Sequence, residues 1–162
     1  MRAVHVNLAR FPILANPYCL HIPRDLYKAM LAQAVVELPN ECCGLLAGTV
    51  TEGIGRVTRR FPLVNAAEDP AIEYLSESRS LFAAHRAMRD LGVEMLAVYH
   101  SHPTSAPIPS RKDRDRNAGE SVVHLIISPV AGRLDVRAWW LTETEATEAD
   151  WKVVNTEITS QG

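Results

Sequence analysis

The stretch VEMLAVYHSHPTSAPIPSRKD, residues 93–113, changes from apolar to polar at its two histidines. Met95 to Tyr99 is almost continuously apolar, which is typical of a strand buried on both faces of a sheet. Residues i and i+2 of a strand point to the same side, so His100 and His102 would direct their imidazoles to one point. The stretch therefore predicts a buried strand that ends in two convergent histidines.

Helix and strand patterns alternate on both sides of this strand. Apolar residues recur at helical spacing from Pro23, which suits a first helical turn, to about Leu38, and again from Ser78 to a stop at Gly92. A shorter helix is expected to run from Ser110 to about Ala118. Strands are expected at 42–50, 55–65, 122–129 and 133–142, the first two as a hairpin, with an extended piece near 72–76 and a strand or helix in the tail 143–162. The alternation predicts an α/β fold with a mixed sheet and helices on both faces.

Length and composition indicate the class of protein. The 162 residues, 47% of them hydrophobic and 22% charged, predict a single domain over residues 1–162 with its core at about 22–142. A formal net charge of −2 gives no electrostatic reason to expect binding to nucleic acid or to an acidic membrane surface.

The expected location follows from targeting and cysteine patterns. No apolar stretch approaches the roughly 18 to 20 residues that span a bilayer. Arg10, Pro12 and Pro17 interrupt what would have to be the apolar region of a signal peptide. Three cysteines, two of them adjacent at Cys42 and Cys43, do not suit a disulfide framework. The sequence therefore predicts a cytoplasmic protein.

Asp113 can complete a metal site with the two histidines. It lies eleven residues beyond His102, and the intervening prolines restrict the loop, so the start of the short helix could turn the carboxylate back. Three protein ligands with one open position are typical of catalytic zinc. The spacing therefore predicts zinc bound by His100, His102 and Asp113.

Two further residues are candidates for catalysis. Glu41, at the entry to the strand that begins at Cys42, could accept a proton from a water polarised by the metal. Ser110 could donate a hydrogen bond to the oxyanion that forms when water attacks a carbonyl. Both have plainer interpretations: Glu41 as a solvated surface carboxylate, and Ser110 with Asp113 as a helix-capping pair, which is compatible with metal binding.

The remaining reactive side chains are weaker candidates. His85 lies on the apolar face of the second helix and His124 within a buried strand, so both are expected to be satisfied core histidines. Cys42 or Cys43 could act as a thiol nucleophile, but cysteines in buried strands are usually inert. No two cysteines stand three residues apart, which disfavours a zinc deaminase.

Two blocks of the sequence resemble a known family. HSHPTSAPIPSRKD, residues 100–113, is similar to the signature of the JAMM (MPN+) metalloproteases: His-Ser/Thr-His, seven residues, Ser, two residues, Asp. It matches at every defined position: His100, Ser101, His102, Ser110 and Asp113. ELPNECCGLLAG, residues 37–48, resembles the family's other block, in which Glu41 corresponds to the catalytic glutamate. The resemblance spans about residues 26–140.

The resemblance implies a mechanism and a fold. Zinc would be held by His100, His102 and Asp113, with water activated by Glu41 and the tetrahedral intermediate steadied by Ser110. The fold would be similar to that of cytidine deaminases, with a curved mixed sheet between helices.

The resemblance also implies a substrate class. Family members hydrolyse amide or isopeptide bonds at the C-terminal tail of ubiquitin-like proteins, and short bacterial members release an amino acid from a sulfur carrier that ends in Gly-Gly. The chain leaves no room for the long insertions that bind ubiquitin chains, which argues against polyubiquitin. A catalytically silent scaffold of the same fold and a metal-binding interaction module remain alternatives.

Overall fold

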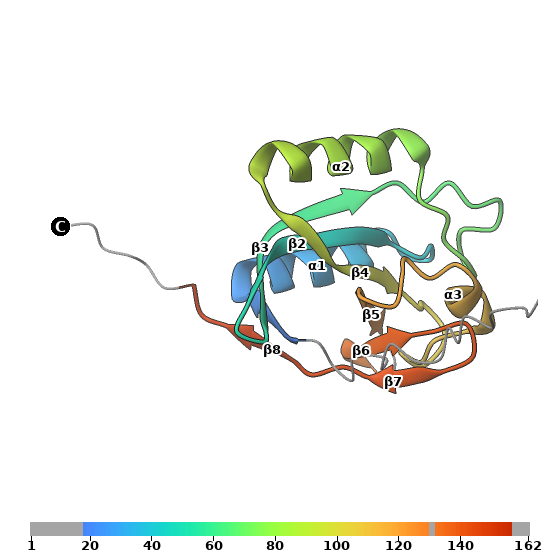
Figure 1. Cartoon of the computed structure of the whole chain (residues 1–162). Helices are drawn as coiled ribbons and strands as arrows, with labels where there is room; N and C mark the ends of the chain where they lie inside the picture. The colour runs from blue at the N-terminus through green and yellow to red at the C-terminus, as the bar shows by residue number, and fades with distance from the viewer. Residues whose placement is uncertain (1–17, 130–131, 157–162) are drawn as a thin grey trace, which may run out of the picture.

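The computed structural model describes residues 18–129 and 132–156, which form one twisted, curved sheet with helices packed against it (Figure 1). The strands are β1 (Cys19–Pro23), β2 (Cys43–Thr51), β3 (Ile54–Leu63), β4 (Glu94–Ser101), β5 (Val123–Ser128), β6 (Asp135–Leu141), β7 (Ala146–Glu148) and β8 (Trp151–Val154). Their order in the sheet is β7-β6-β5-β4-β2-β3-β1-β8. The pairs β4–β5, β1–β3 and β1–β8 are parallel and the others antiparallel, so the predicted mixed α/β sheet is confirmed.

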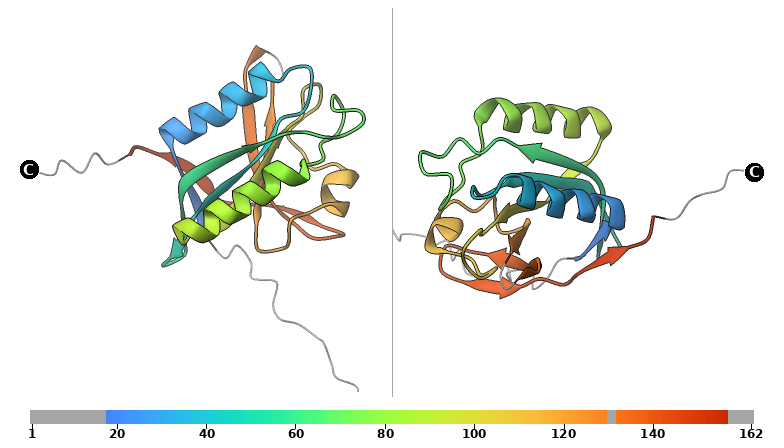
Figure 2. Two further views of the ribbon diagram at one scale, coloured as in Figure 1. Left: turned by 90° about the horizontal axis from the view of Figure 1, so that it is seen from above. Right: turned by 180° about the vertical axis from the view of Figure 1, so that it is seen from behind.

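The two longer helices, α1 (Arg24–Val36) and α2 (Ser78–Leu91), cover opposite faces of the sheet (Figure 2). α1 buries Met30 and Ala34 in a core that includes Leu46 and Tyr99. α2 packs on the other face, in a core that includes Leu45 and Val98. Because side chains of a strand alternate between faces, consecutive residues of β2, and of β4 from Ala97 to Tyr99, serve the two cores in turn. The expectation of helices on both faces is confirmed.

The limits of α2 agree with the prediction because both of its ends are capped. The Glu77 side chain accepts a hydrogen bond from the Ser80 backbone N–H, and Gly92 ends the helix at φ 65°, a left-handed conformation that favours glycine.

The prediction for His85 is wrong: its side chain is exposed. The buried stripe of α2 consists of Ala84 and Met88, four residues apart, and His85 lies just outside it.

The N-terminal part of the fold differs from the prediction. Pro23 is the N-cap of α1 and the last residue of β1, so it precedes the first helical turn. β1 was not predicted from the sequence, although Leu20 and Ile22 alternate with less buried residues there. β1 pairs with β3 and β8, both distant in sequence, so its formation depends on tertiary contacts.

The centre of the sheet places the two motif blocks side by side. β2 and β3 form the predicted hairpin, and β2 also pairs antiparallel with β4, with Cys43 opposite His100. Beyond this pair, the Cys42 N–H donates to Ser101 Oγ (2.8 Å) and the Ser101 N–H donates to Cys42 O (3.1 Å). Glu41 therefore enters β2 next to the end of β4.

The remaining elements are shorter than predicted. The third helix, α3, spans Arg111–Asp115 and ends before Ala118, and the tail forms strands β7 and β8. Predictions for Arg10, Pro12 and Pro17 and for tail residues 157–162 lie outside the described residues.

None of the helices within residues 18–129 and 132–156 has both the length and the hydropathy needed to cross a membrane.

Candidate metal centre and active site

Three of the predicted site residues converge at the end of β4. His100 Nε2 lies 3.1 Å from His102 Nε2 and 3.2 Å from Asp113 Oδ1, and His102 Nε2 lies 3.2 Å from Asp113 Oδ2. All three side chains are buried. Two imidazole nitrogens and one carboxylate are a donor set that suits a zinc ion with an open position. The residues present therefore fit the metal that the sequence predicts.

The backbone at the end of β4 sets the direction of the two imidazoles. His100 lies within the strand, whereas His102 follows its last residue, Ser101. The His102 N–H nevertheless donates to Ile127 O at 2.8 Å, so the chain continues alongside β5. The expected i, i+2 arrangement is therefore kept past the end of the strand.

Hydrogen bonding and stacking orient the two rings. His102 Nδ1 lies 2.9 Å from Ala106 O, which can only accept, so Nδ1 carries the proton and leaves Nε2 free to bind a metal. The ring of Tyr74 stacks on His100 with centroids 4.6 Å apart. His100 Nδ1 has no hydrogen-bond partner among the described residues.

Asp113 is held by a capping box at the start of α3. The Ser110 N–H donates to Asp113 Oδ2 (2.7 Å), and the Asp113 N–H donates to Ser110 Oγ (3.1 Å). Burial alone would raise the pKa of the Asp113 carboxyl, but its contacts with the His100 and His102 rings and the hydrogen bond from the Ser110 backbone outweigh it. The pKa therefore lies well below its usual value, and Asp113 is available as an anionic ligand. The capping interpretation of Ser110 is confirmed.

Glu41 is buried beside this group. Only 5% of it is exposed, so the interpretation as a solvated surface carboxylate is wrong. Its N–H donates to Pro70 O (2.7 Å), and Asn65 Nδ2 donates to its carbonyl (3.0 Å). Oε2 has no hydrogen-bond partner among the described residues, and burial raises the pKa of the carboxyl to about 7.

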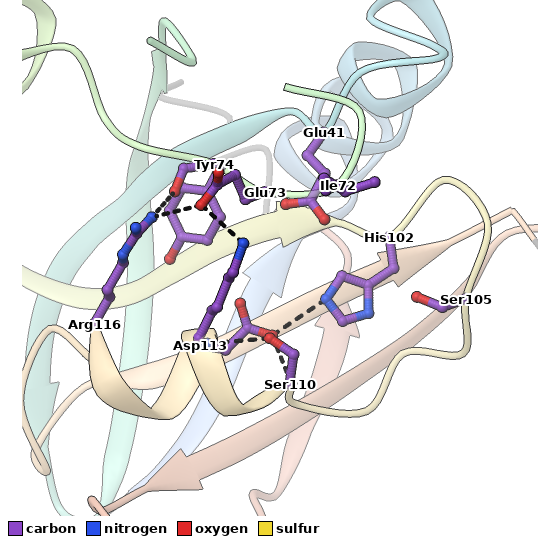
Figure 3. Close-up of a pocket in the computed structure, with 10 residues that line it drawn as sticks. Glu41, Ile72, Glu73, Tyr74, His102, Ser105, Ser110, Asp113 and Arg116 are labelled. Atoms are coloured by element: carbon purple, nitrogen blue, oxygen red, sulfur yellow. Dashed lines mark hydrogen bonds and ion pairs between the residues drawn. The ribbon is translucent and has the colours of Figure 1, made fainter. Parts of the chain in front are cut away.

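A small cavity of about 90 Å³ connects these groups. Glu41, His102, Ser110 and Asp113 line it, with Ser110 exposed at its edge (Figure 3). A carboxyl with a pKa near neutrality next to a metal-binding group can both accept and return a proton at physiological pH. The arrangement therefore suits metal-assisted hydrolysis.

The weaker candidates lie outside this cavity. His124 is 1% exposed, as predicted, but neither ring nitrogen has a partner among the described residues, so the expectation of a satisfied histidine is wrong. Burial raises the pKa of Cys42 to about 11 and that of Cys43 to about 12. Both thiols are therefore protonated at neutral pH, which argues against a thiol nucleophile.

Several residues around the cavity were not predicted from the sequence. They lie in the loop between β3 and α2, or in α3 and its C-cap on the side that lines the cavity: Asn65, Glu73, Tyr74, Lys112 and Arg116. No local pattern marks them, because only the path of the chain between β3 and α2 brings residues 65–74 to the end of β4.

Comparison with known families identifies the group to which this arrangement belongs. Residues 23–142 match the family described as prokaryotic homologs of the JAB domain. The chain belongs to this family. The expected JAMM/MPN-type relationship is thereby confirmed.

Named relatives of the JAB chain are hydrolases. A desampylase from Haloferax volcanii is 36% identical over 101 residues, which cover 62% of this chain and 70% of the relative. The CysO-cysteine peptidase of Mycobacterium tuberculosis is 34% identical over 139 residues, covering 85% of this chain and 92% of the relative. The expectation of an enzyme of the peptidase class is therefore confirmed for the family.

A solved structure shares the fold. A protein from Desulfitobacterium hafniense, known from its solution structure, superposes with a TM-score of 0.75 at 28% identity. The match covers 85% of this chain and 94% of that one.

Proposed function

We propose that this JAB protein is a zinc-dependent peptidase that cleaves an amide bond at the C-terminal Gly-Gly of a ubiquitin-like or sulfur-carrier protein in the cytoplasm. The observation that carries the proposal is the cavity in which two of the three metal-binding side chains, His102 and Asp113, meet the buried carboxyl of Glu41, whose Oε2 has no hydrogen-bond partner among the described residues. A purely structural metal site would be closed by protein ligands and would not need that carboxylate.

His100 Nε2, His102 Nε2 and Asp113 would hold the ion. When bound, zinc supplies Lewis acidity that polarises a carbonyl oxygen and lowers the pKa of a water. The His102 hydrogen bond to Ala106 O and the capping box of Asp113 keep two of the three ligands in place before the metal arrives.

Glu41 transfers the proton in the reaction. Its carboxylate takes one proton from water as the water oxygen bonds to the scissile carbonyl carbon, and then gives that proton to the amide nitrogen as the C–N bond breaks. The products are a carboxylic acid and an amine, and the acid then loses the second proton of the water to the amine or to solvent and becomes a carboxylate. Burial raises the pKa of this carboxyl in the metal-free protein, which favours a group that takes up and releases a proton in turn.

Ser110 would stabilise the oxyanion. Its Oγ accepts a hydrogen bond from the Asp113 N–H, and its exposed hydroxyl hydrogen remains able to donate into the cavity. That donor would face the oxygen on which charge develops.

The small size of the cavity supports a glycine-rich substrate. Its volume of about 90 Å³ accommodates a backbone without large side chains, as glycine provides. One relative is named a peptidase of CysO-cysteine, a protein conjugate with an amino acid. No nucleic acid or membrane takes part in the proposed reaction.

Mass spectrometry tests the proposal. Candidate ubiquitin-like carriers, each extended beyond Gly-Gly, would be incubated with the zinc-loaded protein. We expect one product mass that corresponds to cleavage after the second glycine. Intact carriers would contradict the proposal and favour a silent scaffold or a metal-binding module.

A second substrate tests the fit of the cavity. Replacing the second glycine of a cleaved carrier by valine should slow cleavage strongly, because a β-branched side chain would collide with the cavity walls. An unchanged rate would reject the narrow cavity as the tail-binding site without affecting the metal assignment.

A further inference from the structure

Two cations, Lys112 in α3 and Arg116 at its C-cap, line the cavity and are not used by the mechanism above. Lys112 Nζ and Arg116 Nη1 lie 3.3 and 3.2 Å from the same oxygen, Glu73 Oε2. Arg116 also donates to Tyr74 O at 3.4 Å. In Figure 3, Arg116, Glu73 and Tyr74 lie together at the side of the cavity opposite Ser105. One carboxylate facing two cations leaves an excess positive charge at this side.

The position of this charge is specific to the side of α3 that meets Glu73. Lys112 lies within α3, Arg116 is the C-cap of the helix, and both side chains reach Glu73 Oε2. Arg111 carries the same charge, but it is 88% exposed, pairs with Asp115 on the same helix and does not line the cavity. The cations at the cavity are therefore distinguishable from the general surface charge.

Bond lengths define which substrate group could reach these cations. When an amino acid is joined through its amine to the scissile carbonyl, its own carboxyl carbon lies no more than about 3.8 Å from the scissile carbon. A second residue would move that carboxylate away by about 3.3 to 3.6 Å. A conjugated lysine side chain would place only methylene groups there. A cation in the same small cavity as the metal ligands can therefore detect a single-residue extension.

We infer that Lys112 and Arg116 form a carboxylate-binding subsite that selects substrates in which one amino acid, with its α-carboxylate free, follows Gly-Gly. This inference rests on the proposed function. The incoming carboxylate competes with Glu73 for the two cations. Because Lys112 and Arg116 are about half exposed, solvent weakens the attraction, and we expect a selectivity of about tenfold.

The test compares two forms of one substrate. A ubiquitin-like carrier ending in Gly-Gly-Ala would be made with a free C-terminal carboxylate and with a carboxamide. The zinc-loaded wild type should show a kcat/KM about tenfold higher for the acid. In Lys112→Met/Arg116→Met, this acid-to-amide ratio should fall to about one, whereas Arg111→Met, the matched control on α3, should keep the wild-type ratio.

Glu73→Gln should change the acid-to-amide ratio in the opposite direction from the double variant. Removing the competing carboxylate should raise the acid-to-amide ratio above that of the wild type. If the cations only anchored residues 73 and 74, both variants would change the two rates alike and leave the ratio unchanged. A carrier ending in Gly-Gly-Ala-Ala should show no acid preference.

Binding gives a readout without turnover. The dissociation constants of zinc-loaded Glu41→Gln for the two carriers should differ by the same factor of about ten. Equal kcat/KM for acid and amide in the wild type, or a ratio that survives in the double variant, would overturn the subsite. Cleavage of neither carrier would overturn the proposed function and the subsite with it.

Discussion

The two faces of the sheet at β2 and β4 each hold a buried or partly buried polar cluster, and the clusters differ in how completely their atoms are paired. On the α1 face, the Tyr99 hydroxyl donates to Gln33 Oε1 (2.5 Å), and Arg60 donates to both Tyr99 Oη (3.0 Å) and Gln33 Oε1 (2.8 Å). Gln33 Nε2 donates in turn to Cys43 O (3.1 Å). Every side chain of this network therefore has a protein partner.

On the α2 face, several buried atoms have no partner among the described residues. They are Glu41 Oε2, His100 Nδ1 and both ring nitrogens of His124. The indole nitrogen of Trp140, in the α1-side core, is also unpaired, so a single such atom does not identify a site.

The difference in pairing indicates which polar cluster stabilises the fold and which one takes part in function. Buried polar groups that are paired stabilise a fold, whereas unpaired ones cost stability and persist mainly where they bind or react. The concentration of unpaired atoms next to a metal donor set is what distinguishes the α2 face. Substitutions on the two faces should therefore have opposite consequences.

The largest effect is expected from the metal ligands. His102→Ala removes one of three donors and should strip zinc from the protein, together with the hydrolytic activity. Metal analysis of the purified variant would measure this loss. Zinc bound at wild-type stoichiometry would show that the ligand assignment is wrong.

Glu41→Gln should stabilise the metal-free protein. The folded-state pKa of about 7 exceeds the ordinary value of 4.5, so the folded protein binds a proton that the unfolded chain has released, and wild-type stability falls as pH rises from about 4.5 to 7. The amide removes this penalty. Urea unfolding should show a gain of about 3 kcal/mol at pH 8 and little at pH 4. The same gain at both pH values would contradict a buried carboxyl that titrates near 7.

His124→Leu should reduce acid sensitivity. Burial, and to a smaller extent the neighbouring His100, lowers the pKa of His124 to about 4. Between pH 6.5 and 4 the unfolded chain therefore binds a proton that the folded protein does not bind. Wild-type stability is therefore lost as pH falls through this window. The variant should lose about 2 kcal/mol less than the wild type between pH 7 and pH 5 in urea titrations. Parallel pH profiles of the two proteins would argue against a neutral, buried His124.

On the paired α1 face, Tyr99→Phe should act in the opposite direction. It removes the hydroxyl that joins Gln33 to Arg60 and should cost about 1 to 2 kcal/mol of unfolding free energy. Zinc content should not change, because Tyr99 points away from the metal ligands. A variant that unfolds normally but loses zinc would mean that the two faces are not independent.

Local patterns were sufficient to predict the central elements. The apolar run before His100 and the Gly92 stop identified β4 and the end of α2, because burial and helix termination depend on adjacent residues. The spacing of His100, His102 and Asp113 was also sufficient to predict that they lie together, since a strand end and a capping box have fixed local geometry.

Features that depend on distant contacts could not be predicted in this way. β1 needs β3 and β8 as neighbours, and the burial of Glu41 depends on Pro70 and Asn65 in a loop. His85 was wrongly predicted to be buried, because on a helix the residue next to a buried one, here Ala84, can face solvent.

The most direct test of the account compares wild type and Glu41→Gln with zinc content and hydrolysis measured on the same samples. Both proteins should bind one zinc ion through His100, His102 and Asp113, and the variant should cleave a Gly-Gly-extended carrier about 10² to 10⁴ times more slowly. Equal cleavage rates at equal zinc content would show that Glu41 is not the proton acceptor and would contradict the central claim.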